Sequence, residues 1–133
     1  MKYFLDTNIC SYFLKGINEN LRDPLLSENP NEIKIPSIVK AELLYGAEKS
    51  MKRDYNLKRI SEFILPLGII GFNDAEASEY GEIRADLEKK GTRIGPNELV
   101  IASIVKANNG ILITNNTKEF SRVEGLLIED WTK

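Results

Sequence analysis

The sequence predicts an α/β fold with a mostly parallel central sheet and helices on both of its faces. Short β-prone apolar runs alternate with longer amphipathic segments, and polar residues follow the ends of predicted strands, at Asp6 and at Asn115-Asn116. The 133 residues, 42% hydrophobic and 29% charged, have the size and composition of one globular domain. No repeat, low-complexity tract or linker divides the chain, so we expect a single domain spanning residues 1–133.

Missing residue types exclude most catalytic chemistries. The chain has no histidine and one cysteine, Cys10, which excludes Ser-His-Asp and Cys-His catalysis and His-rich zinc sites. It also has no Cys-x-x-Cys pair, no Walker phosphate loop and no Gly-rich dinucleotide motif. An enzyme of this composition would have to rely on carboxylates, with a hard metal ion.

The charge balance does not by itself indicate a nucleic-acid binder. The net charge is −2 and the pI is near 5.3, although a local basic rim can still contact phosphates. The candidates for such a rim are Lys49, Lys52, Arg53, Lys58, Arg59, Arg84, Lys89, Lys90 and Arg93. With no secretory signal, no apolar run long enough to span a bilayer and a single cysteine, we expect a cytoplasmic protein without membrane contacts.

The first strand and helix meet at Asp6. Tyr3-Phe4-Leu5 reads as a buried strand, and Thr7 and Asn8 carry oxygens suited to capping a helix that ends at Gly16. Asp6 would then lie at the carboxyl end of a parallel strand, where ligands bind in open sheets. The alternative is that Asp6 only caps the helix.

The second predicted strand and helix bring in Glu42. A short strand at Ile33–Ile35 ends at Pro36, and Ser37 is expected to cap a helix from about Ile38 to Lys49. At helical spacing Glu42 shares a side with Ile38, Ala41, Tyr45 and Lys49, a face expected to pack inward. Because an unpaired buried charge is costly, the Glu42 carboxylate needs a metal or an arginine partner. Gly46 lies in mid-helix, where glycine costs stability, and this suggests close helix packing.

The second half of the chain repeats the alternation. After a basic helix from Met51 to about Phe63, a strand lies within Ile64–Phe72, and a helix capped by Asn73 runs to Lys90 and stops at Gly91. Asn97 is the expected N-cap of the next helix, which places Glu98 in its first turn, where the helix dipole also favours an acid.

The last elements return to the sheet. A turn at Asn108-Asn109-Gly110 leads to a strand at Ile111–Thr114, followed by a helical turn around Lys118–Phe120 and a last strand at Leu126–Ile128. In this arrangement Asp6, Glu42 and Glu98 could converge at one rim of the sheet.

In order and spacing, these motifs make the chain resemble the PIN-domain ribonucleases, and specifically the VapC-type toxins of bacterial toxin–antitoxin pairs. The matching pieces extend over nearly the whole chain: Phe4-Leu5-Asp6-Thr7-Asn8, Pro36-Ser37, Ala41–Gly46, Tyr80–Arg84, Leu87-Glu88, Gly91, Ile94–Asn97, Ile101-Ala102, Ile113–Thr117, Phe120 and Gly125 through Trp131.

The resemblance implies a three-layer α/β/α PIN-like fold that cleaves RNA with acidic residues and Mg²⁺ or Mn²⁺. Its acids correspond to Asp6, Glu42 and Glu98, which we expect to be both catalytic and metal-binding. Glu98 is a departure, because the family usually has Asp there and Glu reaches one methylene further toward an ion with strict geometry. Many PIN domains carry a fourth acid after Thr114. Here Asn116 is neutral, and Glu119 is a candidate substitute.

The resemblance and the chemistry agree on the reaction. A hard divalent ion stabilises charge on phosphate oxygens and lowers the pKa of a bound water, and carboxylates are its preferred ligands. We expect Thr7, Asn8, Thr114 and Asn116 to orient waters or the scissile phosphate. The substrate would be RNA, with transfer RNA or another structured RNA as the target that the resemblance suggests, and the number of ions, one or two, stays open.

The resemblance also implies partners. A VapB-type antitoxin would cover the acidic site and would carry the contacts to operator DNA. Homodimers are common in the family, with the helices after Gly16 and around Ile38–Tyr45 as the expected surfaces.

Three alternative functions can be compared with this one. A receiver domain needs an adjacent acidic pair after the first strand, and a haloacid-dehalogenase-type phosphatase needs a second Asp where Asn8 stands, so the sequence disfavours both. The serious alternative is a catalytically weakened PIN domain that acts mainly as an antitoxin-binding module in an autorepressing, DNA-bound complex.

Overall fold

The computed structural model describes all 133 residues and contains one sheet of five parallel strands in the order β3-β2-β1-β4-β5. The strands are short: β1 Tyr3–Leu5, β2 Ile33–Pro36, β3 Gly68–Ile70, β4 Ile111–Ile113 and β5 Leu127–Glu129. Every neighbouring pair is parallel. The α/β prediction is therefore confirmed, and the sheet is entirely rather than mostly parallel.

The strand order reverses direction between β1 and β4. The chain first builds β1, β2 and β3 outward on one side, and then returns to add β4 and β5 on the other. In open parallel sheets the carboxyl ends of the strands on either side of such a switch point border a ligand crevice. Asp6 follows β1 and Thr114 follows β4, so both lie at this point.

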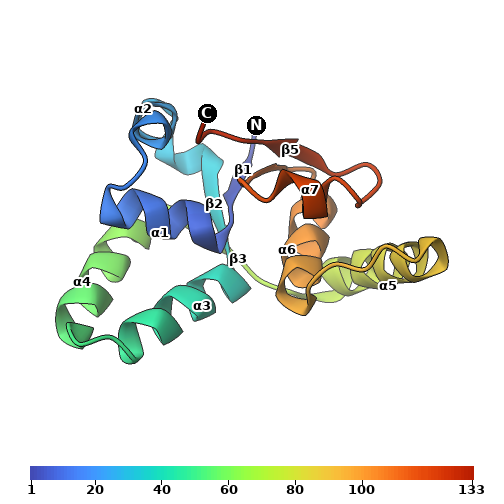
Figure 1. Cartoon of the computed structure of the whole chain (residues 1–133), viewed down its shortest axis with the longest axis horizontal. Coiled ribbons are helices and arrows are strands. Elements are labelled where there is room, and N and C mark those ends of the chain that lie inside the picture. The colour runs from blue at the N-terminus through green and yellow to red at the C-terminus, as the bar shows by residue number, and fades with distance from the viewer.

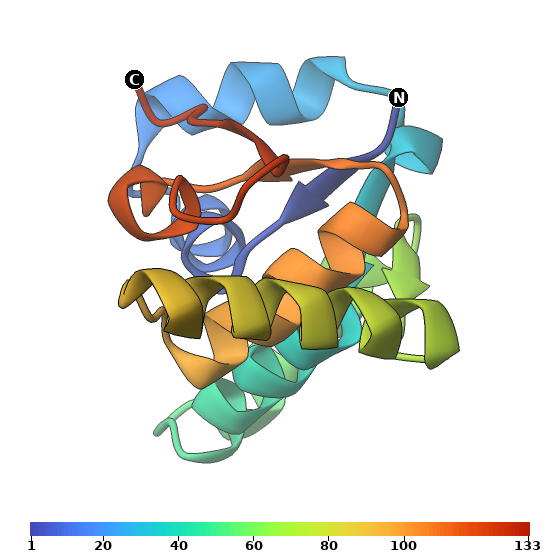
Figure 2. The same cartoon turned by 90° about the vertical axis from the view of Figure 1, so that its right-hand side faces the viewer.

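Helices cover both sides of the sheet (Figure 1). They are α1 Thr7–Lys15, α2 Glu19–Ser27, α3 Ser37–Glu48, α4 Arg53–Ile64, α5 Asp74–Lys90, α6 Pro96–Ala107 and α7 Thr117–Phe120, with a 3₁₀ turn at Pro30–Glu32. In Figure 1 α1, α2 and α4 lie on one side of the strands, α5 and α6 on the other, and α3 lies below α1. Figure 2 shows α5 packed along α6. This is the expected three-layer α/β/α architecture.

The core is the apolar interior of the sheet and its helices. Phe4, Leu5, Ile35, Leu112 and Ile113, which come from three central strands, have no solvent-exposed surface. Strands covered on both faces carry continuous apolar runs, and this is why β1 and β4 could be recognised in the sequence, whereas β2 was recognised by its alternation around Lys34. No helix is long and apolar enough to cross a membrane.

Helix ends follow the sequence signals where glycine or a capping box is present. Gly16 and Gly91 end α1 and α5 in the left-handed conformation, with φ of 65° and 69°. At the start of α5, the backbone N–H of Asn73 donates to Glu76 Oε1 at 2.8 Å. These three predictions are confirmed.

Three other helix starts were predicted wrongly. Asp6 itself is the N-cap of α1, so Thr7 and Asn8 already belong to the helix. Ser37 is the first residue of α3 and makes no cap, and Pro36 precedes it. Gly95, not Asn97, precedes α6, whose first residue is Pro96. Proline suits that position because the first helical N–H needs no partner within the helix.

The inward face of α3 also differs from the prediction. Val39, Leu43 and Ala47 are its buried residues, whereas Tyr45 is 65% exposed. A methyl group at Gly46 would meet no atom within 4 Å, so the glycine does not mark a close helix contact. Glu42 directly precedes buried Leu43 and lies half-buried at the border of the packed face.

Candidate active site

One small cleft brings the three predicted acids together. Asp6, Glu42 and Glu98 line it with Thr7, Asn8, Ile101, Asn116 and Phe120, and its volume is about 100 Å³. The acids come from the end of β1, the middle of α3 and the first turn of α6, so the fold collects residues far apart in the sequence. The predicted convergence is therefore present in the structure.

Asp6 is the most tightly held of these acids. Its Oδ1 accepts a hydrogen bond from the backbone N–H of Ile9 at 2.9 Å, and its Oδ2 accepts one from the hydroxyl of Thr114. Only 5% of Asp6 and none of Thr114 is exposed to solvent. Asp6 thus caps α1 and faces the cleft at once, so the capping role does not compete with a functional one.

The environment raises the pKa of Asp6 from 3.8 to about 6. Burial is the largest cause, because it disfavours the charged form, and repulsion from Glu42 and Glu98 adds to it, while the hydrogen bonds from Thr114 and Ile9 act in the opposite direction. A raised carboxylate pKa in a cleft of acids indicates a site that a cation would stabilise.

Glu42 is oriented by a neighbour on α1. The hydroxyl of Thr7 donates to Glu42 Oε1 at 2.7 Å and joins α1 to α3 across the cleft. Because Thr7 follows Asp6 directly, a single backbone segment supplies one acid and the hydrogen bond that fixes the next.

Glu98 folds back on the loop that precedes its helix. A methyl group on Gly95 would overlap the Oε2 atom of Glu98, so the carboxylate lies directly against the Gly95 Cα. The family that the sequence resembles usually has Asp at this position, and Glu is longer by one methylene. The close approach to Gly95 accommodates this extra length. A residue with a side chain at position 95 would displace it.

Glu119 supports the loop from the other side. Its Oε1 accepts from the backbone N–H of Gly95 at 2.5 Å, and its Oε2 accepts from Asn116 Nδ2 at 3.0 Å. These two bonds, from Asn116 first and then Gly95, lower the pKa of Glu119. Glu119 does not line the cleft, and both of its oxygens are engaged, so its role as a fourth acid stays a prediction.

The polar neighbours expected around the acids divide into two groups. Thr7, Asn8 and Asn116 line the cleft, whereas Thr114 lies beneath it and holds both Asp6 and the backbone N–H of Asn116, at 2.9 Å. Asn115 turns away and donates to Tyr12 Oη at 3.2 Å. Asn8 and Asn116 therefore remain the amides placed to meet a ligand.

The donor set suits a hard divalent cation. No three acidic side chains lie close enough to one another to bind one ion in common. Mg²⁺, however, commonly takes one or two carboxylates and keeps several waters. Carboxylates around Asp6, with no basic side chain lining the cleft, match that chemistry, so Asp6, Glu42 and Glu98 are the residues that could hold Mg²⁺ or Mn²⁺, directly or through its waters.

A larger groove of about 380 Å³ continues from the cleft between α1, α3 and α4. It shares Thr7, Asn8 and Glu42 with the cleft and carries cationic and polar side chains farther out: Lys15, Lys49, Arg59, Ser11, Ser50 and Asn56. Lys49 and Arg59 were among the predicted basic residues. Lys15, Ser11, Ser50 and Asn56 were missed, although Lys15 lies in the last turn of the helix that Asp6 begins.

Comparisons with known proteins agree with this geometry. Residues 3–126 match the PIN domain family. The chain is 45% identical to Ribonuclease VapC2 of Rickettsia felis over 135 aligned residues, which cover 100% of both chains. It is 38% identical to the tRNA(fMet)-specific endonuclease VapC of Shigella flexneri, with 99% of each chain covered.

Solved structures give the same result. The chain resembles the DNA-bound VapBC of Salmonella typhimurium with a TM-score of 0.92, 38% identity and 98% of each chain covered. It resembles VapBC2 of Rickettsia felis bound to a promoter DNA fragment with a TM-score of 0.89, 44% identity, and 98% and 99% of the two chains covered.

Proposed function

Because this chain belongs to the PIN-domain family and is similar to its VapC ribonucleases, we propose that it is a metal-dependent endoribonuclease toxin. The observation that supports this most is the cleft in which Asp6, Glu42 and Glu98 converge next to a basic groove. Hydrolysis of a phosphodiester requires negative charge to be neutralised at the reacting phosphate, and the acids of the cleft would hold a cation that could do this. The basic side chains of the adjoining groove could contact the phosphates farther along the strand.

Asp6, Glu42 and Glu98 would hold the ion. When bound, Mg²⁺ or Mn²⁺ supplies charge stabilisation at the phosphate and acidifies a water. Thr114 and the Ile9 amide fix the two oxygens of Asp6, and Thr7 fixes Glu42, so these carboxylates need little reorganisation. The amides of Asn8 and Asn116 would donate to phosphate oxygens at the mouth of the cleft.

RNA would extend from the cleft along the basic groove. Lys15, Lys49 and Arg59 line it and can each neutralise one phosphate. Three such contacts on a single strand predict that the logarithm of the binding constant falls by about 2 per tenfold increase in salt, at about 0.7 per phosphate. The name of the Shigella flexneri relative makes transfer RNA the first substrate to test.

The similar solved structures support the proposed partners. They are VapBC complexes bound to DNA, which supports a VapB-type antitoxin for this chain, with operator DNA contacted through the antitoxin. A homodimer, and a larger assembly with the antitoxin, belong to the same proposal.

One observation favours a second candidate function. Glu98 stands at the position of the usual Asp, and no three acids lie close enough to share an ion in the structure. A PIN domain whose cleavage is weakened in this way would act chiefly as an antitoxin-binding module in an autorepressing complex.

Cleavage of end-labelled total transfer RNA separates the two functions. The natural protein is incubated with Mg²⁺, Mn²⁺ or EDTA beside Asp6→Ala and Glu98→Asp, with Glu62→Ala as the control because Glu62 is an exposed acid far along the chain on α4. A discrete product that requires metal, disappears in Asp6→Ala and persists in Glu62→Ala supports the enzyme. Cleavage by Glu98→Asp alone supports the binding module.

A further inference from the structure

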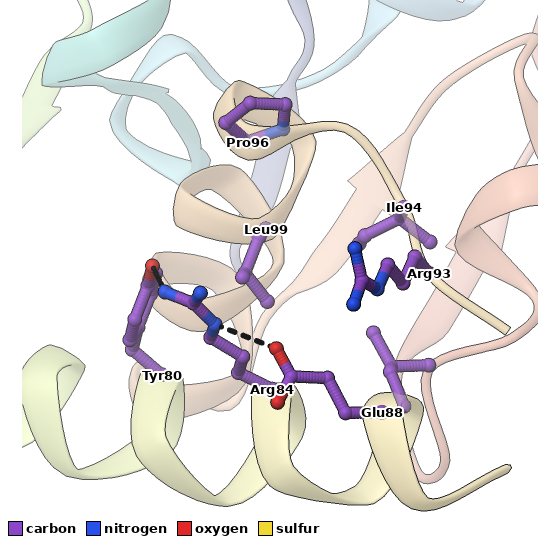
Figure 3. Close-up of a pocket in the computed structure, with 8 residues that line it drawn as sticks. Tyr80, Arg84, Glu88, Arg93, Ile94, Pro96 and Leu99 are labelled. Carbon is purple, nitrogen blue, oxygen red and sulfur yellow. Dashed lines mark hydrogen bonds and ion pairs between the residues drawn. The ribbon is translucent and has the colours of Figure 1, made fainter. Parts of the chain in front are cut away.

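A separate pocket lies next to the first turn of α6, outside both the acidic cleft and the basic groove. It has a volume of about 320 Å³ and lies between α5 and the loop that joins α5 to α6 (Figure 3). Its apolar lining is formed by Leu87, Leu99, Ile94 and Pro96, of which Leu87 and Leu99 are only 2% and 6% exposed. This surface is firm, because the leucines belong to the hydrophobic core.

Three polar side chains on α5 form one hydrogen-bonded array at the edge of the pocket. Arg84 Nε donates to Glu88 Oε2 at 3.0 Å, and Arg84 Nη1 donates to Tyr80 Oη at 3.0 Å (Figure 3). These bonds leave Arg84 Nη2 as an uncommitted donor and Glu88 Oε1 as an uncommitted acceptor. A donor and an acceptor are thus held side by side above an apolar surface.

Arg93 faces this array from the connecting loop. Its guanidinium extends toward the space between the loop and α5 (Figure 3), it is exposed, and it makes no ion pair. Its backbone is nevertheless held, because Arg122 Nη1 donates to the Arg93 carbonyl at 2.7 Å. Two guanidinium groups and one carboxylate make the pocket locally cationic in a chain whose net charge is −2.

The pocket and the acidic cleft share one helical turn. Pro96 and Leu99 line the pocket, while Glu98 between them lines the cleft. The two hollows are therefore separated by about one helix diameter, roughly 10 Å. A nucleic-acid strand whose bases rise about 3.4 Å each would cross that distance within about three nucleotides.

We propose that this pocket holds one unpaired base of the RNA substrate, within about three nucleotides of the cleaved bond. Arg93 contacts a phosphate, Arg84 and Glu88 read the edge of the base, and the apolar lining with Tyr80 receives its face. Unpaired RNA bases are recognised in this way, by stacking on aromatic or guanidinium planes and by hydrogen bonds along their edges. The proposal rests on the proposed ribonuclease function and adds the residues that select the cleavage site.

The chemistry of the pocket favours a base over an acidic peptide. An anionic side chain placed between Arg84 and Arg93 would meet the free carboxylate oxygen of Glu88, whereas every base offers hydrogen-bond donors as well as acceptors. The pocket also lies only about one helix diameter from the cleft in which a phosphodiester would be cut. An RNA strand bound in the cleft would therefore pass close to the pocket.

The test is cleavage of a labelled RNA hairpin with a randomised loop, with the products sequenced to give base preferences around the cut. Arg84→Gln and Glu88→Gln should change the preference at one flanking position by about tenfold, the discrimination expected of one good side-chain–base contact. Arg22→Gln is the control for Arg84→Gln, because Arg22 is an exposed arginine on α2 that lines neither the pocket, the groove nor the cleft. Glu62→Gln is the control for Glu88→Gln.

Arg93→Gln should behave differently, because a phosphate contact carries no sequence information. It should weaken binding of the hairpin pool to the Asp6→Ala protein about equally for all loops and reduce the salt dependence of binding by about 0.7 on logarithmic scales. Arg22→Gln, which changes an exposed arginine on α2 outside the pocket, the groove and the cleft, should leave both unchanged.

Three outcomes decide the proposal. An unchanged cleavage preference in both Arg84→Gln and Glu88→Gln overturns the base contact, and RNA binding by Arg93→Gln equal to that by Arg22→Gln overturns the phosphate contact. If the natural protein cleaves nothing, the proposed function fails. The pocket is then tested by binding alone, by comparing how tightly the hairpin pool binds the Asp6→Ala protein with and without each pocket substitution. Weaker binding of an acidic peptide in Arg93→Gln, with RNA binding unaffected, assigns the pocket to a protein ligand and overturns the proposal.

Discussion

Replacing Asp6 by asparagine should stabilise the metal-free protein at neutral pH. The carboxyl group of Asp6 has its pKa raised from 3.8 to about 6, chiefly by burial and further by Glu42 and Glu98. Between these two values the folded protein binds more protons than the unfolded chain, so the free energy of unfolding falls as the pH rises from about 4 to 6. At 1.36 kcal/mol per tenfold change in proton affinity, the charged form costs about 3 kcal/mol at pH 7.

Asparagine removes the charge and keeps most of the contacts. It can still accept from the Ile9 amide, but it loses the charge-assisted bond from Thr114, which we count as about 1 kcal/mol. The net gain is then about 2 kcal/mol. With an unfolding entropy of about 2.1 cal/mol/K per residue over 133 residues, this raises the melting temperature by about 7 °C.

The assay is thermal unfolding in EDTA between pH 4 and pH 8, followed by circular dichroism. The advantage of Asp6→Asn should be smallest at pH 4, grow to about pH 6 and then level off. The same advantage at every pH, or none at pH 7, would show that the charge of the Asp6 carboxylate does not destabilise the folded protein. Adding Mg²⁺ should stabilise the natural protein more than Asp6→Asn.

Three further changes test the supports of the site, the first two by cleavage rate with thermal unfolding as a check on folding, and the third by thermal unfolding at several pH values. Thr7→Val removes the hydroxyl bound to Glu42, and cleavage should fall about tenfold with little loss of stability; an unchanged rate would mean that Glu42 needs no orientation. Gly95→Ala should displace the flexible carboxylate of Glu98 and reduce cleavage while the protein still folds. Glu119→Gln should destabilise the protein by about 1 kcal/mol at pH 7 and less as the pH falls through the lowered pKa of Glu119, since the unfolded chain protonates first; an equal effect at all pH values would contradict this.

The sequence predicted the parts of the fold that local patterns specify. Continuous apolar runs marked β1 and β4, alternation around Lys34 marked β2, and glycines marked the ends of α1 and α5. The bounds of α2 were not set, because it carries Pro24 inside it and few apolar residues. The inward face of α3 was predicted wrongly, because a helix that packs mainly along one row of small and branched residues leaves its aromatic Tyr45 outside.

The acids could be predicted, but their supports could not. Asp6, Glu42 and Glu98 stood out as carboxylates at a strand end, on a mixed face and in a first helical turn. The bonds from Thr7 to Glu42 and from Gly95 to Glu119 join segments 35 and 24 residues apart, and no local spacing encodes such contacts. The same holds for the groove beside the cleft, whose lining comes from three helices.

The dependence of transfer RNA cleavage on Mg²⁺ concentration tests whether the three acids of the cleft hold the ion. Glu98→Gln keeps the length and shape of the side chain but removes one charge from the cleft, so we expect its half-saturating Mg²⁺ concentration to rise about tenfold or more, while Glu62→Gln matches the natural protein. Identical Mg²⁺ curves for Glu98→Gln and the natural protein would mean that Glu98 takes no part in holding the ion.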